Sequence, residues 1–465
     1  MTKVITEPAR EVPVRDEVDV LVCGGGCAGV AAALAAARNG ARTCLVEHYG
    51  FAGGTLTAAG VNGIGGYQHD LDGRPLVSGI PIEIVQRLAE ADGASPESVA
   101  RLTRPVDSGP VAGLGLNVYW VQAHPEKAKG VFDDMLGEAG VRILYHADAV
   151  MPVMEGSRVR GAFVESKSGR EAILARVLVD CTGDGDIAAR AGAPFDLGRP
   201  GDGACQPMTA IFTVADWSAR AHNDAMKSEP LAAGRYQGYV ARSRADGEIA
   251  LNPNDIFCAA TYLDDRESRA ASVNFTRVQG LSALDAGELS RAEVLGRRQV
   301  AEAVRFMRKH MAGGANCALI SVAAQIGIRE SRRILGDYVL TGQDVQGAAR
   351  FPDAVARGIY TLDIHNPTEV GKPSALIELE KPYDIPYRCL VPRGVEGLLV
   401  AGRCISGDHI ALSSYRIQSH CMAMGQAAGT AAALAAAAGK RPRELDVGLL
   451  RRRLGEDGAN TGEKL

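Results

Sequence analysis

The fold is decided near the start of the chain, by the stretch Val18-Asp19-Val20-Leu21-Val22-Cys23-Gly24-Gly25-Gly26-Cys27-Ala28-Gly29. Its valine-rich half predicts a buried strand, and three glycines follow at G-x-G-x-x-G spacing. The alanine-rich stretch 30–38 predicts a helix, and the apolar run 43–46, which ends at Glu47, predicts a second strand. Strand, glycine turn, helix and strand in this order are typical of a dinucleotide-binding βαβ unit.

Each part of this unit has a physical role. Gly24 permits the tight turn, Gly26 lets the backbone approach a pyrophosphate, and Gly29 lets the helix pack against the strand. The first N–H groups of the helix have no intrahelical partner and favour negative charge, so the phosphates are expected there. Glu47, about twenty residues further on, is expected to accept hydrogen bonds from the adenosine ribose.

Length and composition exclude several classes of protein. A chain of 465 residues is too long for one simple core, and its net charge of −4 argues against a nucleic-acid partner. The ten cysteines are scattered without a C-x-x-C pair, which disfavours a zinc site and favours a reducing, cytoplasmic location. Residues 1–17 lack a signal-peptide core, and the alanine-rich stretch 421–438 predicts a buried helix rather than a membrane span.

Two later segments repeat the pattern of a strand followed by glycine. One is Val177-Leu178-Val179-Asp180-Cys181-Thr182-Gly183-Asp184-Gly185-Asp186, and the other runs from the apolar stretch 395–400 into Ala401-Gly402-Arg403-Cys404-Ile405-Ser406-Gly407-Asp408. Between them the character changes to interleaved charges and long helical patterns. We therefore predict a first domain in two parts, 1–205 and 388–465, with a substrate domain, 206–387, inserted between them.

The periodicity also predicts individual elements. Helices are expected over 80–91, 124–139, 290–310 and 415–438, the third with Ser290 as N-cap and Glu293 at the capping-box position. The polar, glycine-rich stretch 92–116 is expected to form a loop.

Taken together, these segments resemble the FAD-binding domain of the glutathione-reductase-like flavoproteins, and more narrowly the bacterial FAD-dependent oxidoreductase family. Further matching stretches are Phe51-Ala52-Gly53-Gly54-Thr55 and Ile328-Arg329-Glu330-Ser331-Arg332-Arg333. The resemblance implies an α/β protein with a Rossmann-type FAD-binding domain, an inserted α+β substrate domain and FAD as cofactor. It also implies that the helix near Tyr415 aims its N-terminus at the flavin.

The residues expected to bind FAD come from every one of these segments. They are Gly24, Gly26, Cys27, Ala28, Gly29, Glu47, His48, Gly53, Gly54, Thr55, Ala149, Val150, Cys181, Thr182, Gly183, Asp186, Gly402, Arg403, Asp408, Ser414, Arg416 and Ile417. No metal site is predicted.

The candidate catalytic residues are His365, Arg329 and Arg277. His365 has polar neighbours in an expected loop and suits an acid–base role. His409, directly after the last glycine turn, is a less favoured candidate, and His420 is expected to be a packing or capping residue. Arg277 and Arg329, with Arg332, suit a fork around a substrate carboxylate, or else pair with acids such as Glu330 to hold the domains together.

These residues leave three functions open. The first is a dehydrogenase, oxidase or reductase that moves a hydride between a small organic substrate and the flavin, with an external electron donor or acceptor as second partner. The second is a flavin monooxygenase, which is ranked lower because Asp186 stands where that class carries a serine nearby. The third is a non-redox flavoprotein. The sequence makes no prediction of an oligomeric state.

Overall fold

The largest sheet has seven strands and contains the dinucleotide-binding unit. The computed structural model describes residues 4–70, 73–103, 118–250, 258–261, 269–368 and 375–462. Five parallel strands run in the order β5–β2–β1–β8–β19. On β8 the sheet continues with β7, which is antiparallel to β8, and then with β6, which is antiparallel to β7. Their bounds are β1 Val14–Cys23, β2 Thr43–Val46, β5 Arg142–Leu144, β6 Ala147–Glu155, β7 Arg158–Ser166, β8 Gly169–Asp180 and β19 Leu398–Val400.

Strand β8 pairs with strands from both the N-terminal and the C-terminal parts of the chain. On one side it pairs with β1 over almost its whole length. On the other side its first half, 169–174, pairs with β7, and its last residues, 178–180, pair with β19. The C-terminal part of the chain is thereby built into the same sheet as the N-terminal part, as the predicted α/β class requires.

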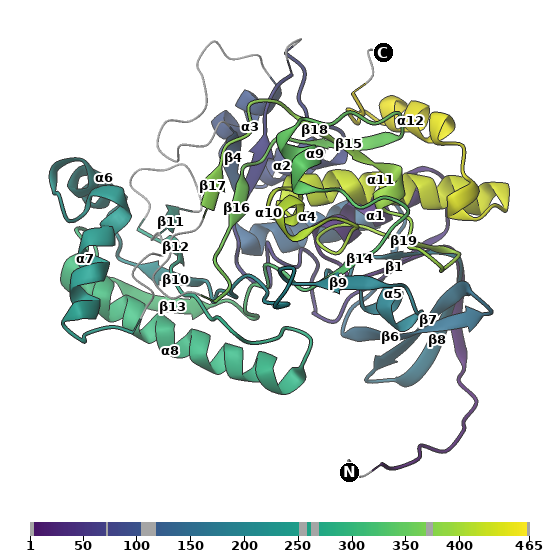
Figure 1. Ribbon diagram of the computed structural model, residues 1–465, viewed down its shortest axis with the longest axis horizontal. Coiled ribbons are helices and arrows are strands. Elements are labelled where there is room, and N and C mark those ends of the chain that lie inside the picture. Colours follow the sequence, from purple (N-terminus) through teal and green to yellow (C-terminus); the bar gives the residue numbers. More distant parts are fainter. Residues whose placement is uncertain are drawn as a thin grey trace.

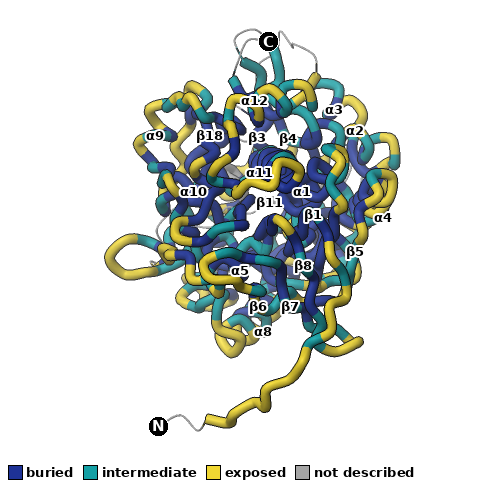
Figure 2. The backbone as a smooth tube through the Cα atoms, turned by 90° about the vertical axis from the view of Figure 1, so that its right-hand side faces the viewer, coloured by how far each residue is buried: buried dark blue, intermediate teal, exposed yellow. Residues whose placement is uncertain are grey.

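Two helices of small residues pack against each other in the centre of the molecule. They are α1 (Cys27–Arg38) and α11 (Gln418–Ala438), which lie side by side near the centre of Figure 1. Figure 2 shows α11 as a dark-blue, buried coil. Alpha11 is long and apolar enough to cross a membrane by composition, but 78% of its most apolar window is buried inside the protein.

A second, antiparallel sheet lies at a distance from the first, at the lower left of Figure 1. Its order is β11–β12–β10–β13, with helices α6, α7 and α8 packed around it. It has its own hydrophobic core, drawn from Met208 to Ile328. The bounds are β10 Phe212–Ala215, β11 Cys258–Thr261, β12 Ala271–Asn274, β13 Ala318–Val322, α6 Ala219–Ser228, α7 Ala233–Ala245 and α8 Ala286–His310.

Smaller elements complete the first core. The short paired strands are β3 Gly63–Tyr67 with β4 Tyr119–Gln122, β9 Phe195–Leu197 with β14 Arg332–Ile334, β15 Ala354–Gly358 with β18 Tyr383–Pro386, and β16 Leu362–Ile364 with β17 Ala375–Ile377. The remaining α-helices are α2 Ile80–Glu90, α3 Pro96–Thr103, α4 Pro125–Glu138, α5 Asp186–Arg190, α9 Gly342–Gln346, α10 His409–Tyr415 and α12 Val447–Glu456.

The two cores bear on the proposed division into domains. The second core ends at Ile328, and residues such as Ile334, Tyr360 and Tyr383 pack in the first core. We therefore propose that the inserted unit with a core of its own ends near residue 328, and that 334–387 belongs structurally with the FAD-binding part.

Three predicted elements differ from the structure. The long helix α8 begins at Ala286 rather than at Ser290, because Asp285 caps it by accepting a hydrogen bond from Glu288 N. The expected helix 415–438 is two helices, α10 and α11, separated at Arg416 and Ile417. The expected loop 92–116 contains helix α3, and residues 104–116 lie outside the described part of the chain.

We predict that Gly429→Ala destabilises the protein through the contact between α11 and α1. A Cβ at Gly429 would lie 2.1 Å from the carbonyl oxygen of Ala32, so α11 would have to move. The free energy of unfolding, measured by chemical denaturation, should fall by roughly 1–3 kcal/mol.

Gly130→Ala is the matched control, since Gly130 lies inside helix α4 with nothing within 4 Å of its added Cβ. This substitution should raise stability by about 0.5–1 kcal/mol through helix propensity alone. Equal effects of the two substitutions would contradict the packing argument.

Candidate functional site

The carboxyl ends of the parallel strands meet at one edge of the sheet. Strand β1 ends at Cys23, β2 at Val46, β8 at Asp180 and β19 at Val400. Backbone hydrogen bonds join the ends of neighbouring strands to the loops that follow them. Gly24 N donates to Val46 O at 2.8 Å, and Cys181 N donates to Cys23 O at 2.8 Å. Open parallel sheets bind ligands beyond this edge.

The glycine turn after β1 has the geometry that was predicted for it. Gly24 has a φ of +96°, and a Cβ there would lie 2.5 Å from Cys181 O, so the position excludes a side chain. A Cβ at Gly29 would lie 1.8 Å from Gly24 O, so α1 sits directly against the turn. The second glycine loop packs on the first, because Gly53 N donates to Gly25 O at 2.7 Å.

Two buried helices begin at this edge without a side-chain cap. The N-cap of α1 is Gly26 and that of α11 is Ile417, and neither helix has an acid in its first turn. Their first N–H groups lack intrahelical partners and carry the positive end of the helix dipole. Both N-termini therefore suit an anionic or carbonyl-bearing ligand. Gly402 lies against the start of α1, since its Cβ would lie 3.0 Å from Ala28 Cβ.

Glu47 is buried at the end of β2 and is held by the backbone. Its Oε2 accepts from Gly25 N at 2.6 Å, and its Oε1 accepts from Tyr49 N at 2.9 Å. The carboxylate thus faces the glycine turn, where a ribose hydroxyl would meet it. The predicted residue His48 follows Glu47 directly, and its Nδ1 is 3.6 Å from Asp148 Oδ1. Ala147 N donates to Glu47 O, and the predicted residues Ala149 and Val150 follow in the same strand, β6.

Asp180 fixes the loop that follows β8. Its Oδ1 accepts hydrogen bonds from the backbone N and hydroxyl of Thr182, at 3.0 and 2.7 Å, and its Oδ2 accepts from Ala188 N at 2.8 Å. Burial raises the pKa of Asp180 in spite of these bonds. The loop that contains Cys181 and Gly183 is therefore held against the first glycine turn by a buried carboxyl group.

Some residues predicted to contact FAD already have partners within the protein. Arg403 donates to Asp184 Oδ1 at 2.8 Å and to Ser331 Oγ at 2.9 Å. Asp408 caps α10 through Ala411 N, and its other oxygen accepts from Gly342 N. The hydroxyl of Ser414 donates to Tyr360 O. Asp186 pairs with Arg332 at 2.9 Å. The cofactor roles of these residues stay predictions.

Buried polar atoms near the start of α11 include a donor and an acceptor that a ligand could pair with. Gln418 Nε2 donates to Val61 O at 2.8 Å, but its Oε1 and the neighbouring Asn62 Nδ2 have no hydrogen-bond partner among the described residues. Both side chains are buried, and an unpaired buried polar atom costs roughly 1–3 kcal/mol. One atom accepts and the other donates, as the alternating edge of a flavin pyrimidine ring requires, so the residues fit FAD.

The three candidate catalytic residues lie together beside this edge. His365 Nε2 is 3.3 Å from Asp363 Oδ2 on β16, and Arg416, between α10 and α11, donates to Asp363 O at 2.9 Å. Arg329 and Arg277 both donate to the hydroxyl of Thr209, at 2.6 and 3.1 Å.

The charges in this cluster act on one another. Burial lowers the pKa of His365 to about 3; Asp363 opposes this shift, and Arg329 and Arg277 add to it. Burial acts to raise the pKa of Asp363, but the hydrogen bond with His365 and the charges of Arg416 and Arg329 hold it below its usual value. His365 is therefore neutral and Asp363 ionised at neutral pH.

Sequence reasoning missed three residues of this cluster. Asp363 stands two positions before His365, and the two-residue period of a strand would have placed both side chains on one face. Gln206, whose Oε1 accepts from His365 N at 3.0 Å, and Thr209 have no local signal, because they reach the site through tertiary contacts. Asn62 and Gln418 were missed for the same reason.

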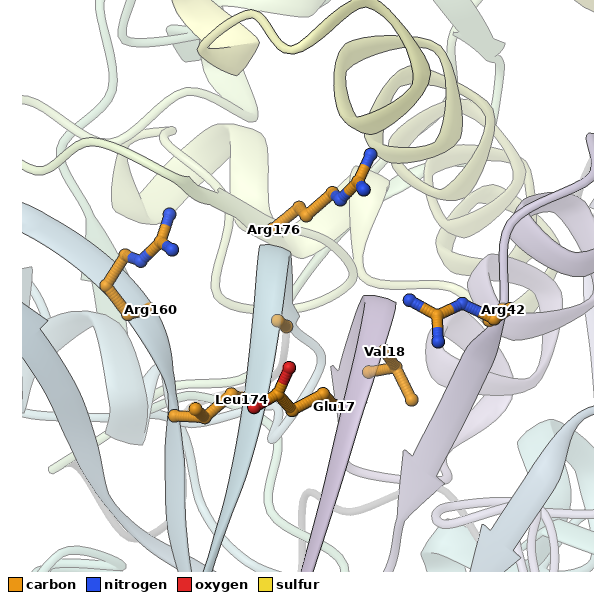
Figure 3. A pocket seen from close by; sticks show the side chains of 7 residues that line it. Glu17, Val18, Arg42, Arg160, Leu174 and Arg176 are labelled. Atoms are coloured by element: carbon orange, nitrogen blue, oxygen red, sulfur yellow. The ribbon is translucent and has the colours of Figure 1, made fainter. Parts of the chain in front are cut away.

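A separate hollow of about 280 Å³ lies on β1 and β8 away from this edge (Figure 3). Arg42, Arg160 and Arg176 border it with Glu17. Arg42 and Arg176 lie 3.1 and 3.4 Å from Asp19 and are exposed, and Arg160 is partly exposed beside Glu155. Ion pairs at the surface contribute little to stability, and these arginines give no evidence of a binding site.

Comparison with known proteins gives one broad match. The family described as "FAD dependent oxidoreductase" matches residues 19–454. The comparison with curated proteins found no match. Three solved structures have low similarity. A geranylgeranyl bacteriochlorophyll reductase-like protein from Thermoplasma acidophilum is 13% identical with a TM-score of 0.44, and the match covers 96% of this chain and 85% of that one. The anhydrotetracycline hydroxylase of Streptomyces rimosus (13% identity, TM-score 0.42) is matched over 91% of this chain and 63% of that one, and the p-nitrophenol 4-monooxygenase of Pseudomonas putida DLL-E4 (12% identity, TM-score 0.46) over 94% and 84%.

We predict that Gly26→Ala weakens FAD binding without destabilising the fold. The nearest atom to a Cβ at Gly26 is Gly54 Cα at 3.9 Å, and the φ of −66° suits alanine, so the protein itself should keep its stability. The new methyl group would occupy the space through which the pyrophosphate approaches the backbone, and FAD content should fall at least about tenfold.

FAD content per protein, measured by absorption, and the melting temperature of the FAD-free protein provide the two readouts. Gly130→Ala should leave both the FAD content and the fold intact. Normal FAD content in Gly26→Ala would contradict a pyrophosphate at this glycine.

Proposed function

The chain belongs to the FAD-dependent oxidoreductase family, and on that premise we propose that it moves a hydride between a small organic substrate and the flavin, with His365 as the acid–base group. It is an enzyme, and its cofactor is FAD. The observation that carries the finer proposal is the partly buried pair of His365 and Asp363, joined through Arg416 to the start of α11.

The residues that would hold FAD line the carboxyl edge of the large sheet. The N-terminus of α1 and the two glycine loops suit the pyrophosphate, Glu47 suits the ribose, and the N-terminus of α11 with Asn62 and Gln418 suits the pyrimidine edge. When it is bound, FAD supplies a group that accepts or donates a hydride. The protein must then supply orientation and one proton acceptor.

The proton acceptor that we propose is His365. Its imidazole is neutral, so it has a lone pair for a proton that leaves a substrate hydroxyl or amine as the hydride departs. Asp363, 3.3 Å from Nε2, stabilises the charged imidazolium that results. The hydrogen bond from His365 N to Gln206 Oε1 fixes the strand that carries both residues.

The second sheet is placed to cover this site. Gln325 N donates to Ala58 O at 3.0 Å, just past the second glycine loop, and the side chain of Gln325 also bonds the hydroxyl of Tyr49. A Cβ at Gly60 would lie 3.3 Å from Ile211, so the sheet rests directly on the loop. This contact supports a substrate position between the two cores, shielded from water.

The direct test is anaerobic reduction of the bound flavin. A panel of small alcohols, amines and hydroxy acids is mixed with the FAD-loaded protein, and loss of the oxidised flavin band is followed. The proposal expects bleaching by at least one compound without NAD(P)H. Bleaching by NAD(P)H alone, followed by oxygen incorporation into an aromatic compound, would instead establish a monooxygenase and overturn the proposal.

We predict that His365→Asn slows flavin reduction by the active compound by about 10²–10⁴-fold, because the proton acceptor is lost. FAD content should stay unchanged, since His365 lies in the substrate cluster. In the unsubstituted enzyme the rate should fall as the pH is lowered through the pKa of His365 in the complex, because the protonated imidazole cannot accept a second proton.

His310→Asn is the control, since His310 is a partly buried residue of α8 that pairs with Glu248 at 2.9 Å. Its rate should match that of the unsubstituted enzyme. An unchanged rate and pH profile in His365→Asn would remove His365 from the reaction.

A further inference from the structure

The hairpin of β3 and β4 presents a polar pair beside the flavin position proposed above. We propose that Trp120 and Gln122 form a subsite for a hydroxyl group of the substrate. The hydroxyl oxygen accepts from the indole N–H, and the hydroxyl hydrogen is donated to the amide oxygen. This subsite deepens the proposed function and rests on it, because it places the substrate next to the residues around His365.

Trp120 and Gln122 lie on the same face of β4. Side chains two positions apart on a strand point to the same side, and the strand register pairs Gln122 with Gly63 of β3. A Cβ at Gly65 would lie 2.8 Å from three atoms of the indole ring, and one at Gly63 would lie 3.1 Å from the nearest ring atom. The ring therefore turns its face to the backbone of β3, which leaves the indole little freedom to move.

Each of these two side chains has a buried polar atom without a partner. Both side chains are half-buried, but Trp120 Nε1 and Gln122 Oε1 themselves are buried and have no hydrogen-bond partner among the described residues. The indole N–H can only donate, and the amide oxygen can only accept. Buried groups of this kind are costly when unpaired, so a ligand that pairs with both is favoured.

A hydroxyl group pairs with both atoms at once. Its oxygen accepts a hydrogen bond from Trp120, and its hydrogen is donated to Gln122. A ketone or an ether oxygen accepts but cannot donate, and an ammonium group donates but cannot accept. A carboxylate would place a second acceptor against the amide oxygen. The pair therefore favours a substrate with a neutral hydroxyl group.

On one side the hairpin borders the proposed position of the flavin ring. Ala123 N, directly after Gln122, donates to Asn62 O at 2.8 Å. In the first turn of α11, Ser419 Oγ donates to Gly65 O at 2.5 Å. The subsite thus lies next to Asn62, whose amide we assign to the pyrimidine edge.

On the other side the indole contacts the segment that carries the proposed proton acceptor. The rings of Trp120 and Tyr360 lie 5.7 Å apart at 74°, in an edge-to-face arrangement. Strand β16 begins two residues after Tyr360 and contains Asp363, which pairs with His365. A hydroxyl group bound at the subsite therefore lies between the flavin edge and the pair of Asp363 and His365. Trp120 and its partner Gln122 select and orient the substrate, and proton transfer stays with His365.

The test compares compounds that differ only in the polar substituent, on the FAD-loaded protein. Cyclohexanol, cyclohexanone, methoxycyclohexane and methylcyclohexane form one series, and phenol, anisole and toluene form a second series on a flat ring. Binding is followed by the change in the flavin absorption spectrum. We expect the alcohol or phenol to bind roughly ten- to a hundredfold more tightly than the hydrocarbon, with the ketone and ethers between, because the hydrocarbon leaves both buried groups unpaired.

Two variants separate the donor from the acceptor. Trp120→Phe keeps a flat ring but removes the N–H, so it should weaken the binding of cyclohexanol and of cyclohexanone by roughly tenfold relative to methylcyclohexane. Gln122→Leu removes only the acceptor, so it should lower the affinity for cyclohexanol to that for cyclohexanone and leave cyclohexanone unchanged. FAD content should be unchanged in both. A structural role alone would weaken the binding of every compound alike.

Tryptophan fluorescence gives a second readout on the unsubstituted protein. The chain has two tryptophans, and the other one, Trp217, is 2% exposed in the core of the second sheet. Cyclohexanol should change the emission, and Trp120→Phe should abolish this change. Gln237→Leu, at an exposed position of α7, is the control and should behave as the unsubstituted protein does.

Equal affinities for the alcohol, the ether and the hydrocarbon in both series would overturn the proposed subsite, since the two polar atoms would then be paired with water. A preference for the alcohol that neither Trp120→Phe nor Gln122→Leu changes would also overturn it. If Trp120→Phe does not fold, the order of affinities in the unsubstituted protein and in Gln122→Leu still decides.

The outcomes also separate the subsite from the proposed function. Selective binding of a hydroxyl compound that depends on Trp120 and Gln122, together with no flavin reduction by any compound, would support the subsite and contradict hydride transfer. Flavin reduction by a compound without a hydroxyl group, at a rate that neither variant changes, would support hydride transfer and contradict the subsite.

Discussion

Helix α11 lies so close to α1 that a Cβ at Gly425 or Gly429 would fall 2.1 Å from a carbonyl oxygen of α1. Helices can approach to this distance only where one of them has no side chain at the contact. The approach brings the N-termini of both helices to the carboxyl edge of the same sheet. Since α1 comes from the first residues of the chain and α11 from the last, this contact joins the two parts of the cofactor site.

A second constraint holds the inserted unit in place. Glu330 and Arg333 are both buried and form an ion pair, with His409 Nδ1 2.8 Å from the same carboxylate. Arg333 also donates to Gly198 O and Gly407 O, and Glu330 accepts from Gln206 N at 3.0 Å. Buried charges are tolerated only when they are paired and hydrogen-bonded in this way. The cluster ties both ends of the inserted unit to α10, beside the residues that surround His365.

The site therefore combines two electrostatic environments. At the sheet edge, helix N-termini and backbone N–H groups provide fixed partial charges that suit an anionic cofactor. At the second sheet, full charges on arginines surround a neutral histidine. The connection between α10 and α11 carries Arg416, which donates to Asp363 O and Arg329 O and so links the two environments.

The sequence by itself determined the local parts of this protein. Residues 18–29 specified a strand, a turn and a helix, and Glu47 and the later glycine segments lie where they were expected. Glycine is needed where the backbone has a positive φ or where two segments approach closely, so its positions in the sequence indicate these turns directly. The FAD-binding fold followed from the order of these segments. Helix boundaries were less well determined: Asp285 caps α8, and the break at Arg416 has no strong signal in its neighbours.

Only the tertiary structure decided which charged residues meet. Arg277 and Arg329 reach the hydroxyl of Thr209 across 68 and 120 residues of chain, and no local pattern records a contact of that span. The same holds for Asn62 and Gln418, whose unpaired amide atoms are visible only once burial is known. Local sequence fixes backbone geometry, whereas burial and electrostatic environment belong to the packed chain, and the pKa of His365 is set by the packed chain alone.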